Sequence, residues 1–153
     1  MEARKIFTIG ETVYDIIFSE GQIVAGKAGG SMLNASVSLG RLGMEVVFIS
    51  EVGQDDLGNL IINFLKENGI KTGFIHQFKD GKTPVALAFL DQHQNARYTF
   101  YKQYPNIRLS QPFPEVTEND IVLFGSFFSI STEVREPVVN FVRKARQAGA
   151  III

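Results

Sequence analysis

Short apolar runs that alternate with helical patterns constrain the fold of this chain more than any other feature of the sequence. Four runs are typical of buried strands: residues 5–10, 45–50, 71–76 and 120–125. Between them lie segments with helical periodicity. Strands that alternate with helices predict a parallel sheet with right-handed crossovers, so the expected fold class is α/β.

The helical segments differ in how clearly they can be recognised. Leu57, Leu60, Ile61, Phe64 and Leu65 repeat at the spacing of one helix face. Asp55 or Asp56 can cap the start of this helix. Residues 32–42 predict a compact helix rich in small residues, and residues 134–145 carry a further apolar stripe. Gly43, Gly69 and Gly149 stand where these three helices would end.

Two β-rich segments do not fit between the layers of such a fold. Residues 13–18 and 22–25 surround a turn, and residues 84–91 and 97–102 predict a hairpin. We expect these segments to pair with each other as a small sheet outside the main core. Residues 104–116 contain three prolines and predict a loop. The last residues, 150–153, begin another buried strand, which predicts that the chain is a fragment of a longer protein.

Composition excludes several classes of function. The 153 residues carry a net charge of −1, which argues against nucleic acid or an anionic membrane as the main partner. The sequence has no cysteine, so it has no disulfide, thiolate nucleophile or Cys-type zinc site. His76 and His93 lack clustered carboxylates, and we expect no metal site. The first residues lack the pattern of a signal peptide and no apolar run is long enough to span a bilayer, which predicts a cytoplasmic protein.

A glycine pair opens the first predicted helix. Gly29 and Gly30 allow a ligand to approach the backbone, and free N–H groups at a helix start bind oxygen atoms. Asn34, one turn further on, offers a donor and an acceptor. This combination suits a polyhydroxy ligand. The alternative is a plain glycine-rich turn into a helix.

One carboxylate follows the first predicted strand. Asp15 comes after Gly10 and Glu11, near the carboxyl edge of the sheet, where ligands bind in open α/β folds. It can accept hydrogen bonds from two neighbouring sugar hydroxyls. The alternative is a solvated acid on an exposed strand.

Together, these motifs resemble the first signature of the ribokinase/PfkB carbohydrate kinases. The matching pieces are GExxxD at Gly10, Glu11 and Asp15, GGxxxN at Gly29, Gly30 and Asn34, RLG at 41–43 and VGQDDLG at 52–58. Met32 departs from the pattern, since that family usually has Gly, Ala or Pro at this position, and it predicts a narrower or differently shaped sugar pocket.

The resemblance implies a ribokinase-like, three-layer α/β/α fold of which residues 1–153 are the N-terminal part. Segments of about 12–26 and 84–103 would be inserted as a β-sheet lid over the sugar. The implied substrate-binding residues are Asp15, Gly29, Gly30, Asn34, Tyr101 and Ser126. Asp55 and Gly58 would serve structure, as a helix cap and a point of close approach.

The resemblance also implies ATP-dependent phosphorylation of a sugar hydroxyl, with ATP and Mg²⁺ bound by the full-length protein. The family's catalytic GAGD motif is absent from this sequence, so we expect no catalytic residue and no activity in the fragment. The lid sequence RYTFYK favours a fructose-like ketose. Because bare edge strands tend to pair, we expect the protein to form a homodimer through the lid, as the resemblance also implies.

Two alternative functions and one misleading motif can be compared with this hypothesis. A sugar-binding or regulatory module without kinase activity would keep the same pocket. A dinucleotide-binding oxidoreductase is disfavoured because GxGxxG does not follow the first strand. The run from Gly21 to Ala28 nearly spells a P-loop, but Ala28 replaces the Mg²⁺-binding hydroxyl, and the run falls in a predicted β insert.

Overall fold

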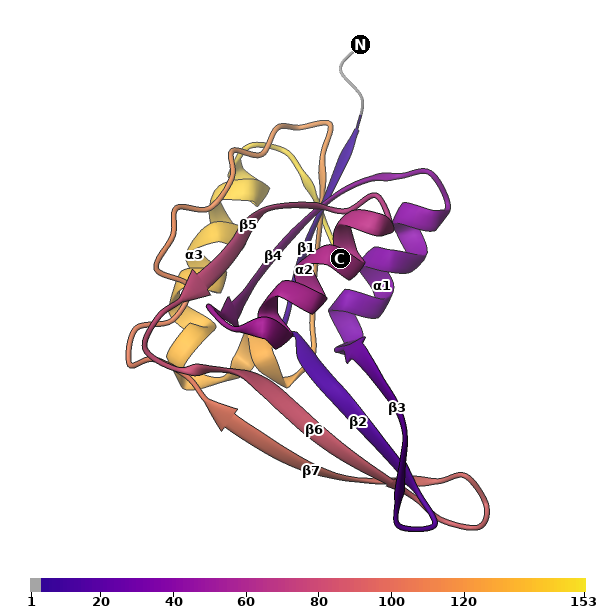
Figure 1. Cartoon of the computed structure of the whole chain (residues 1–153). Coiled ribbons are helices and arrows are strands. Elements are labelled where there is room, and N and C mark those ends of the chain that lie inside the picture. The colour runs from indigo at the N-terminus through magenta and orange to yellow at the C-terminus, as the bar shows by residue number, and fades with distance from the viewer. Residues whose placement is uncertain (1–3) are drawn as a thin grey trace.

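A parallel sheet forms the centre of the computed structural model, which describes residues 4–153 (Figure 1). Its strand order is β5-β4-β1-β8-β9, and every pair of neighbours is parallel. The strands are β1 (Lys5–Ile9), β4 (Glu45–Gly53), β5 (Lys71–Phe78), β8 (Ile121–Phe124) and β9 (Ile151–Ile152). The predicted α/β class is confirmed.

Helices cover both faces of this sheet and produce three layers. They are α1 (Ser31–Arg41), α2 (Asp56–Glu67) and α3 (Thr132–Gln147), and a short 3₁₀ helix, η1 (Phe127–Ile130), precedes α3. Side chains of alternate parity along β1 and β4 point to opposite faces. Ile6, Val46 and Phe48 pack with α1 and α2, whereas residues such as Phe7 and Ile49 pack with α3.

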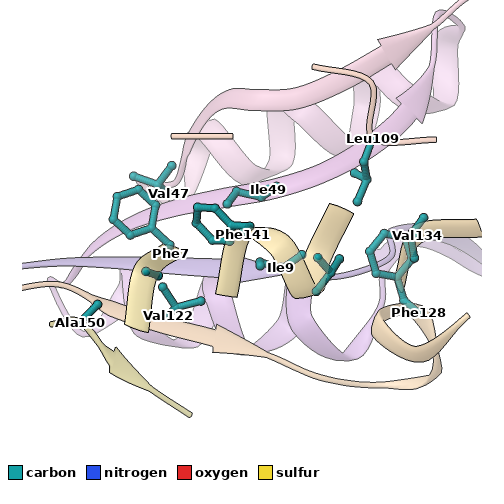
Figure 2. Close-up of a cluster of buried hydrophobic side chains, with 12 residues drawn as sticks. Phe7, Ile9, Val47, Ile49, Leu109, Val122, Phe128, Val134, Phe141 and Ala150 are labelled. Carbon is teal, nitrogen blue, oxygen red and sulfur yellow. The ribbon is translucent and has the colours of Figure 1, made fainter. Parts of the chain in front are cut away.

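The apolar stripe of α3 holds this helix against the sheet. Val134, Val138, Phe141 and Ala145 are all buried, at the spacing that the sequence predicts. Figure 2 shows Phe141 and Val134 of this stripe among the side chains of β1 and β4. Burial of a side chain as large as Phe141 contributes roughly 2–3 kcal/mol.

A second, smaller sheet projects from one end of the three layers (Figure 1). Its strands are β2 (Val13–Ser19), β3 (Gln22–Gly29), β6 (Lys82–Leu90) and β7 (Ala96–Gln103), in the order β3-β2-β6-β7. The prediction that the two β-rich segments pair with each other outside the main core is therefore confirmed. The central pair, β2 and β6, is parallel, and the two outer pairs are antiparallel.

Several boundaries differ from those predicted. The strand predicted at 71–76 runs on to Phe78, and the pairing of β4 with β5 continues through Gly53 and Phe78. The sequence did not predict η1. The prediction that the chain begins without a signal peptide rests in part on residues 1–3, which lie outside the described residues. Among residues 4–153, no helix combines the length and the apolar character needed to cross a lipid bilayer.

Candidate functional site

Four of the six predicted site residues line one cavity of about 500 Å³ at the carboxyl edge of the parallel sheet. Asp15 comes from β2, Gly30 and Asn34 from the start of α1, and Ser126 from the turn after β8. Ser126 is far from the other three in sequence, and it meets them because the parallel neighbours β1 and β8 end at the same edge of the sheet. The polyol hypothesis requires this convergence of the carboxylate with the opening of the helix.

The two glycines bring the backbone of α1 close to this carboxylate. Gly29 does not line the cavity, but it lies directly against the carboxylate that does. A Cβ at this position would lie 2.1 Å from Asp15 Oδ2. Gly30, the N-cap of α1, has a φ of 120° that favours glycine, and a Cβ there would lie 2.4 Å from the Glu11 carbonyl oxygen. Among residues 4–153, no side chain caps the N-terminus of α1, so its first N–H groups are available to a ligand.

Asp15 is half-buried, and among residues 4–153 its carboxylate has no hydrogen-bond donor. Burial raises the pKa of Asp15 above its usual value, and the opposing charge of Lys27, its cross-strand neighbour on β3, lowers it only in part. A desolvated carboxylate without a donor is suited to accept hydrogen bonds from a bound polar ligand.

Ser126 adopts a strained backbone conformation at the edge of the cavity. Its φ is 64° with ψ at 173°, a region that residues other than glycine rarely occupy. The Ser126 hydroxyl accepts a hydrogen bond from Phe128 N at 3.3 Å and so caps η1. Strain of this kind is often maintained where a side chain has to stand at a binding site.

The structure brings a different set of aromatic residues over the cavity from the one predicted. Tyr98 and Phe100 line it, and their rings are stacked with centroids 5.9 Å apart. Tyr101 stands on the opposite face of β7, is 60% exposed and does not line the cavity. Successive side chains of a strand alternate between faces, and the sequence RYTFYK does not reveal which face is turned inward.

Glu11 is a functional candidate to which the sequence analysis assigned no role. Its carboxylate accepts hydrogen bonds from Lys102 Nζ at 2.7 and 2.9 Å and from the Tyr104 hydroxyl at 2.5 Å. Burial, followed by the charge of Glu11, raises the pKa of Tyr104, so its phenol remains a donor. The only sequence indication was the place of Glu11 in the GExxxD motif.

A second cavity of about 500 Å³ adjoins the first. The two share Glu11, Lys102, Phe127 and Phe128, so the Glu11–Lys102 ion pair stands at their boundary. A larger cavity of about 620 Å³, between residues 112–117 and α3, includes none of the predicted site residues. The convergence of polar groups, and not volume, therefore identifies the candidate site.

The structure also places the remaining motifs. Gly26 and Lys27 lie within β3 and not between a strand and a helix, so the P-loop interpretation lacks its structural context. Asp55 caps α2 by accepting from Gly58 N at 2.9 Å, as predicted. Among the described residues, no three His, Asp or Glu side chains gather in a way that could hold a metal ion.

Comparison with known proteins relates this geometry to a family. Residues 3–153 match the family described as pfkB family carbohydrate kinase. A probable fructokinase-3 of Arabidopsis thaliana is 23% identical over 92% of the chain and 42% of its own length. The chain thus spans about half the length of the relatives it matches or less.

Two solved structures share the fold. An uncharacterized sugar kinase from Pyrococcus horikoshii is 25% identical, with a TM-score of 0.81 over 96% of this chain and 53% of the other. A fructokinase from Xylella fastidiosa with bound ATP is 24% identical, with a TM-score of 0.80 over 97% of this chain and 47% of the other. The three-layer arrangement with its small second sheet is the fold of such sugar kinases.

Proposed function

Since the chain belongs to the pfkB family of carbohydrate kinases, we propose that the full-length protein transfers the γ-phosphoryl group of ATP to a hydroxyl of a sugar. Residues 4–153 would provide the sugar-binding part. Phosphoryl transfer depends mainly on positioning and electrostatic stabilisation, so the role of this part is to hold the acceptor hydroxyl in place.

One observation carries this proposal: Asp15, Asn34 and the open N-terminus of α1 converge on one cavity under the aromatic pair of β7. A sugar ring has hydroxyls on its rim and apolar C–H faces. The carboxylate and the amide would bind hydroxyls, and Tyr98 and Phe100 would cover an apolar face. We also propose that Gly29 and Ser126 take part in sugar binding, because they shape the same site. Tyr101 would influence the sugar only indirectly, through its neighbours on β7.

The proposed acceptor is a fructose-like ketose. Its support is that several relatives are named fructokinases and that the aromatic strand β7 covers the cavity. One relative, from Salmonella typhimurium, is named an aminoimidazole riboside kinase, so ribosides belong in the same screen.

We assign the catalytic base and most of the ATP site to residues outside this chain. The sequence contains no Gly-Ala-Gly-Asp motif, and residues 4–153 do not gather ligands for Mg²⁺. Mg²⁺ would neutralise charge on the phosphates during transfer, and no residue of this chain is given that role. The cytoplasm is the proposed compartment because it supplies ATP.

The sheet of β2, β3, β6 and β7 is the proposed lid over the sugar, and its outer face is the proposed dimer contact with a second copy of the protein. On this face Phe18 and Phe89 stack with centroids 4.8 Å apart, and Ile23 is 65% exposed. An apolar face of this kind gains stability when a partner removes it from water.

The decisive experiment measures ATP- and Mg²⁺-dependent phosphorylation of fructose, ribose, ribosides and 2-keto-3-deoxygluconate by the full-length protein. We expect activity on one of these acceptors, its loss in Asp15→Asn, and none from the isolated 153-residue chain. Robust activity of the isolated chain would contradict the assignment of the base. Sugar binding in a thermal-shift assay without transfer would favour the non-catalytic sugar-binding module instead.

A further inference from the structure

A buried ion pair between Glu51 and Arg108 fixes the loop that follows β7. Neither residue lines the first cavity, whereas Arg108 lines the adjoining second one. Glu51 lies near the carboxyl end of β4, and its side chain is 1% exposed. One carboxylate oxygen accepts from Arg108 Nε and the other from Leu109 N at 3.0 Å. Glu51 thereby holds two successive residues of the loop against the central sheet.

This pair is poorly suited to stabilise the fold by itself. The side chain of Arg108 is 6% exposed, and its Nη2 atom is buried without a hydrogen-bond partner among the described residues. Leu109 is buried with a φ of 47°, which is strained for a leucine. Buried ion pairs can often be replaced by apolar residues of similar size without loss of stability. The arrangement therefore requires an explanation other than stability.

A continuous series of contacts leads from this pair to the lid. The Arg108 guanidinium carbon lies 3.3 Å from the centre of the Tyr104 ring. Tyr104 in turn donates to Glu11, and Glu11 accepts from Lys102 on β7. Lys102 shares the inner face of β7 with Phe100 and Tyr98, which line the sugar cavity.

We propose that Glu51 and Arg108 are positioning residues that set the place of β7 over the sugar cavity, and with it the affinity for the acceptor, without contacting the acceptor themselves. This inference rests on the proposed function. Its physical basis is that a rigid, planar guanidinium held by a buried carboxylate fixes the Tyr104 ring, and Tyr104 fixes the Glu11–Lys102 bridge that ties β7 to the loop after β1.

The test is a double substitution, Glu51→Leu with Arg108→Met, in the full-length protein. It removes both charges together, so no uncompensated charge remains in the interior. We expect an unchanged or higher Tm, a KM for the sugar that rises about tenfold and a kcat within about twofold of the wild type. Glu45→Gln is the matched control. Glu45 lies at the other end of β4, and the change removes only its exposed ion pair with Lys71 of β5 and leaves the lid contacts in place.

An unchanged KM in a folded double variant would overturn the inference. If the double variant does not fold, Tyr104→Phe tests the inference instead. It keeps the stacked ring and removes only the hydroxyl that donates a hydrogen bond to Glu11. A KM raised at constant Tm supports the inference, and an unmoved KM overturns it. A wild-type protein that phosphorylates no sugar would refute the proposed function together with this inference, whereas an active wild type with unmoved variants refutes only the positioning role.

Discussion

Asp55 accepts a hydrogen bond from the Thr83 hydroxyl at 2.7 Å and a second from Thr83 N at 2.8 Å, which ties the start of α2 to the beginning of the lid strand β6. The same carboxylate caps α2 through Gly58 N. A single side chain therefore joins the three-layer body to the second sheet.

Replacement of Asp55 by Ala is expected to reduce the free energy of unfolding by about 2 kcal/mol, because a helix cap and the contact with Thr83 are both lost. Urea denaturation of the full-length protein measures this difference. Asp56→Ala is the control, since Asp56 lies in the first turn of the same helix but does not cap it.

The contribution of Asp55 is also expected to depend on pH. Burial alone would raise its pKa, but the hydrogen bonds from Thr83 and Gly58 outweigh burial and hold the pKa below the usual value. A lowered folded-state pKa stabilises the fold above the unfolded value of 3.8, and the effect is lost as the pH falls through the folded-state pKa. The stability difference between the wild type and Asp55→Asn should therefore shrink in acid. A difference that grows as the pH falls would contradict this assignment.

The contribution of Asp15 to stability is expected to depend on pH in the opposite direction. Its pKa is raised by burial, so the stability linked to this group is present at acid pH and is lost as the pH rises through the folded-state value. At neutral pH, Asp15→Asn should therefore keep or raise the Tm. The same change should lower kcat/KM for the sugar about 100-fold, since charge-assisted hydrogen bonds are lost. A variant with normal kcat/KM would exclude Asp15 from the binding site.

The strained backbone at Ser126 predicts that two substitutions there will differ in stability but agree in their effect on sugar binding. Ser126→Gly relieves the positive φ and should raise the free energy of unfolding by about 1 kcal/mol. Ser126→Ala retains the strain and removes the hydroxyl, so it should not be more stable than the wild type. If the hydroxyl binds the sugar, both variants will show a higher KM, and denaturation combined with kinetics measures the two effects.

Gly29→Ala tests the close approach between the helix start and the carboxylate. The added methyl group would stand 2.1 Å from Asp15 Oδ2, so the flexible carboxylate has to turn away. We expect sugar affinity to fall about tenfold or more, because small displacements of binding groups are costly. Gly73→Ala on β5 is the control, since no atom lies within 4 Å of a Cβ there. Isothermal titration with the sugar distinguishes the two variants.

The proposed dimer can be disrupted on the outer face of the lid. Phe89→Glu places a charge beside Phe18 and should convert a dimer to a monomer in sedimentation velocity. Leu60→Glu on the exposed side of α2 provides the control, because it introduces the same charge at an apolar residue away from the lid. A wild-type protein that sediments as a monomer would rule out this contact.

The elements themselves were predictable because their patterns are local. The cap of α2 at Asp55 and the buried strand at 45–50 each depend on neighbours within a few residues, and the structure confirms both. The predicted stripe of α2 is confirmed only in part, since Ile61 and Leu65 are buried but Leu60 is 50% exposed. Asp15, Gly30 and Asn34 could be brought together in advance because parallel strands and the helices that follow them share one edge of the sheet.

Tertiary structure alone decided which side chains of β7 line the cavity and how Glu51 meets Arg108. A period of two is compatible with either face turned inward, so the choice of Tyr98 and Phe100 over Tyr101 depends on the pairing of β7 with β6. Glu51 and Arg108 are 57 residues apart, and no local pattern relates a strand end to a distant loop. The sequence determined the elements and the edge at which they meet, because these follow from short-range periodicity and chain direction. The identity of the contacts across that edge arises only when the two sheets pack together.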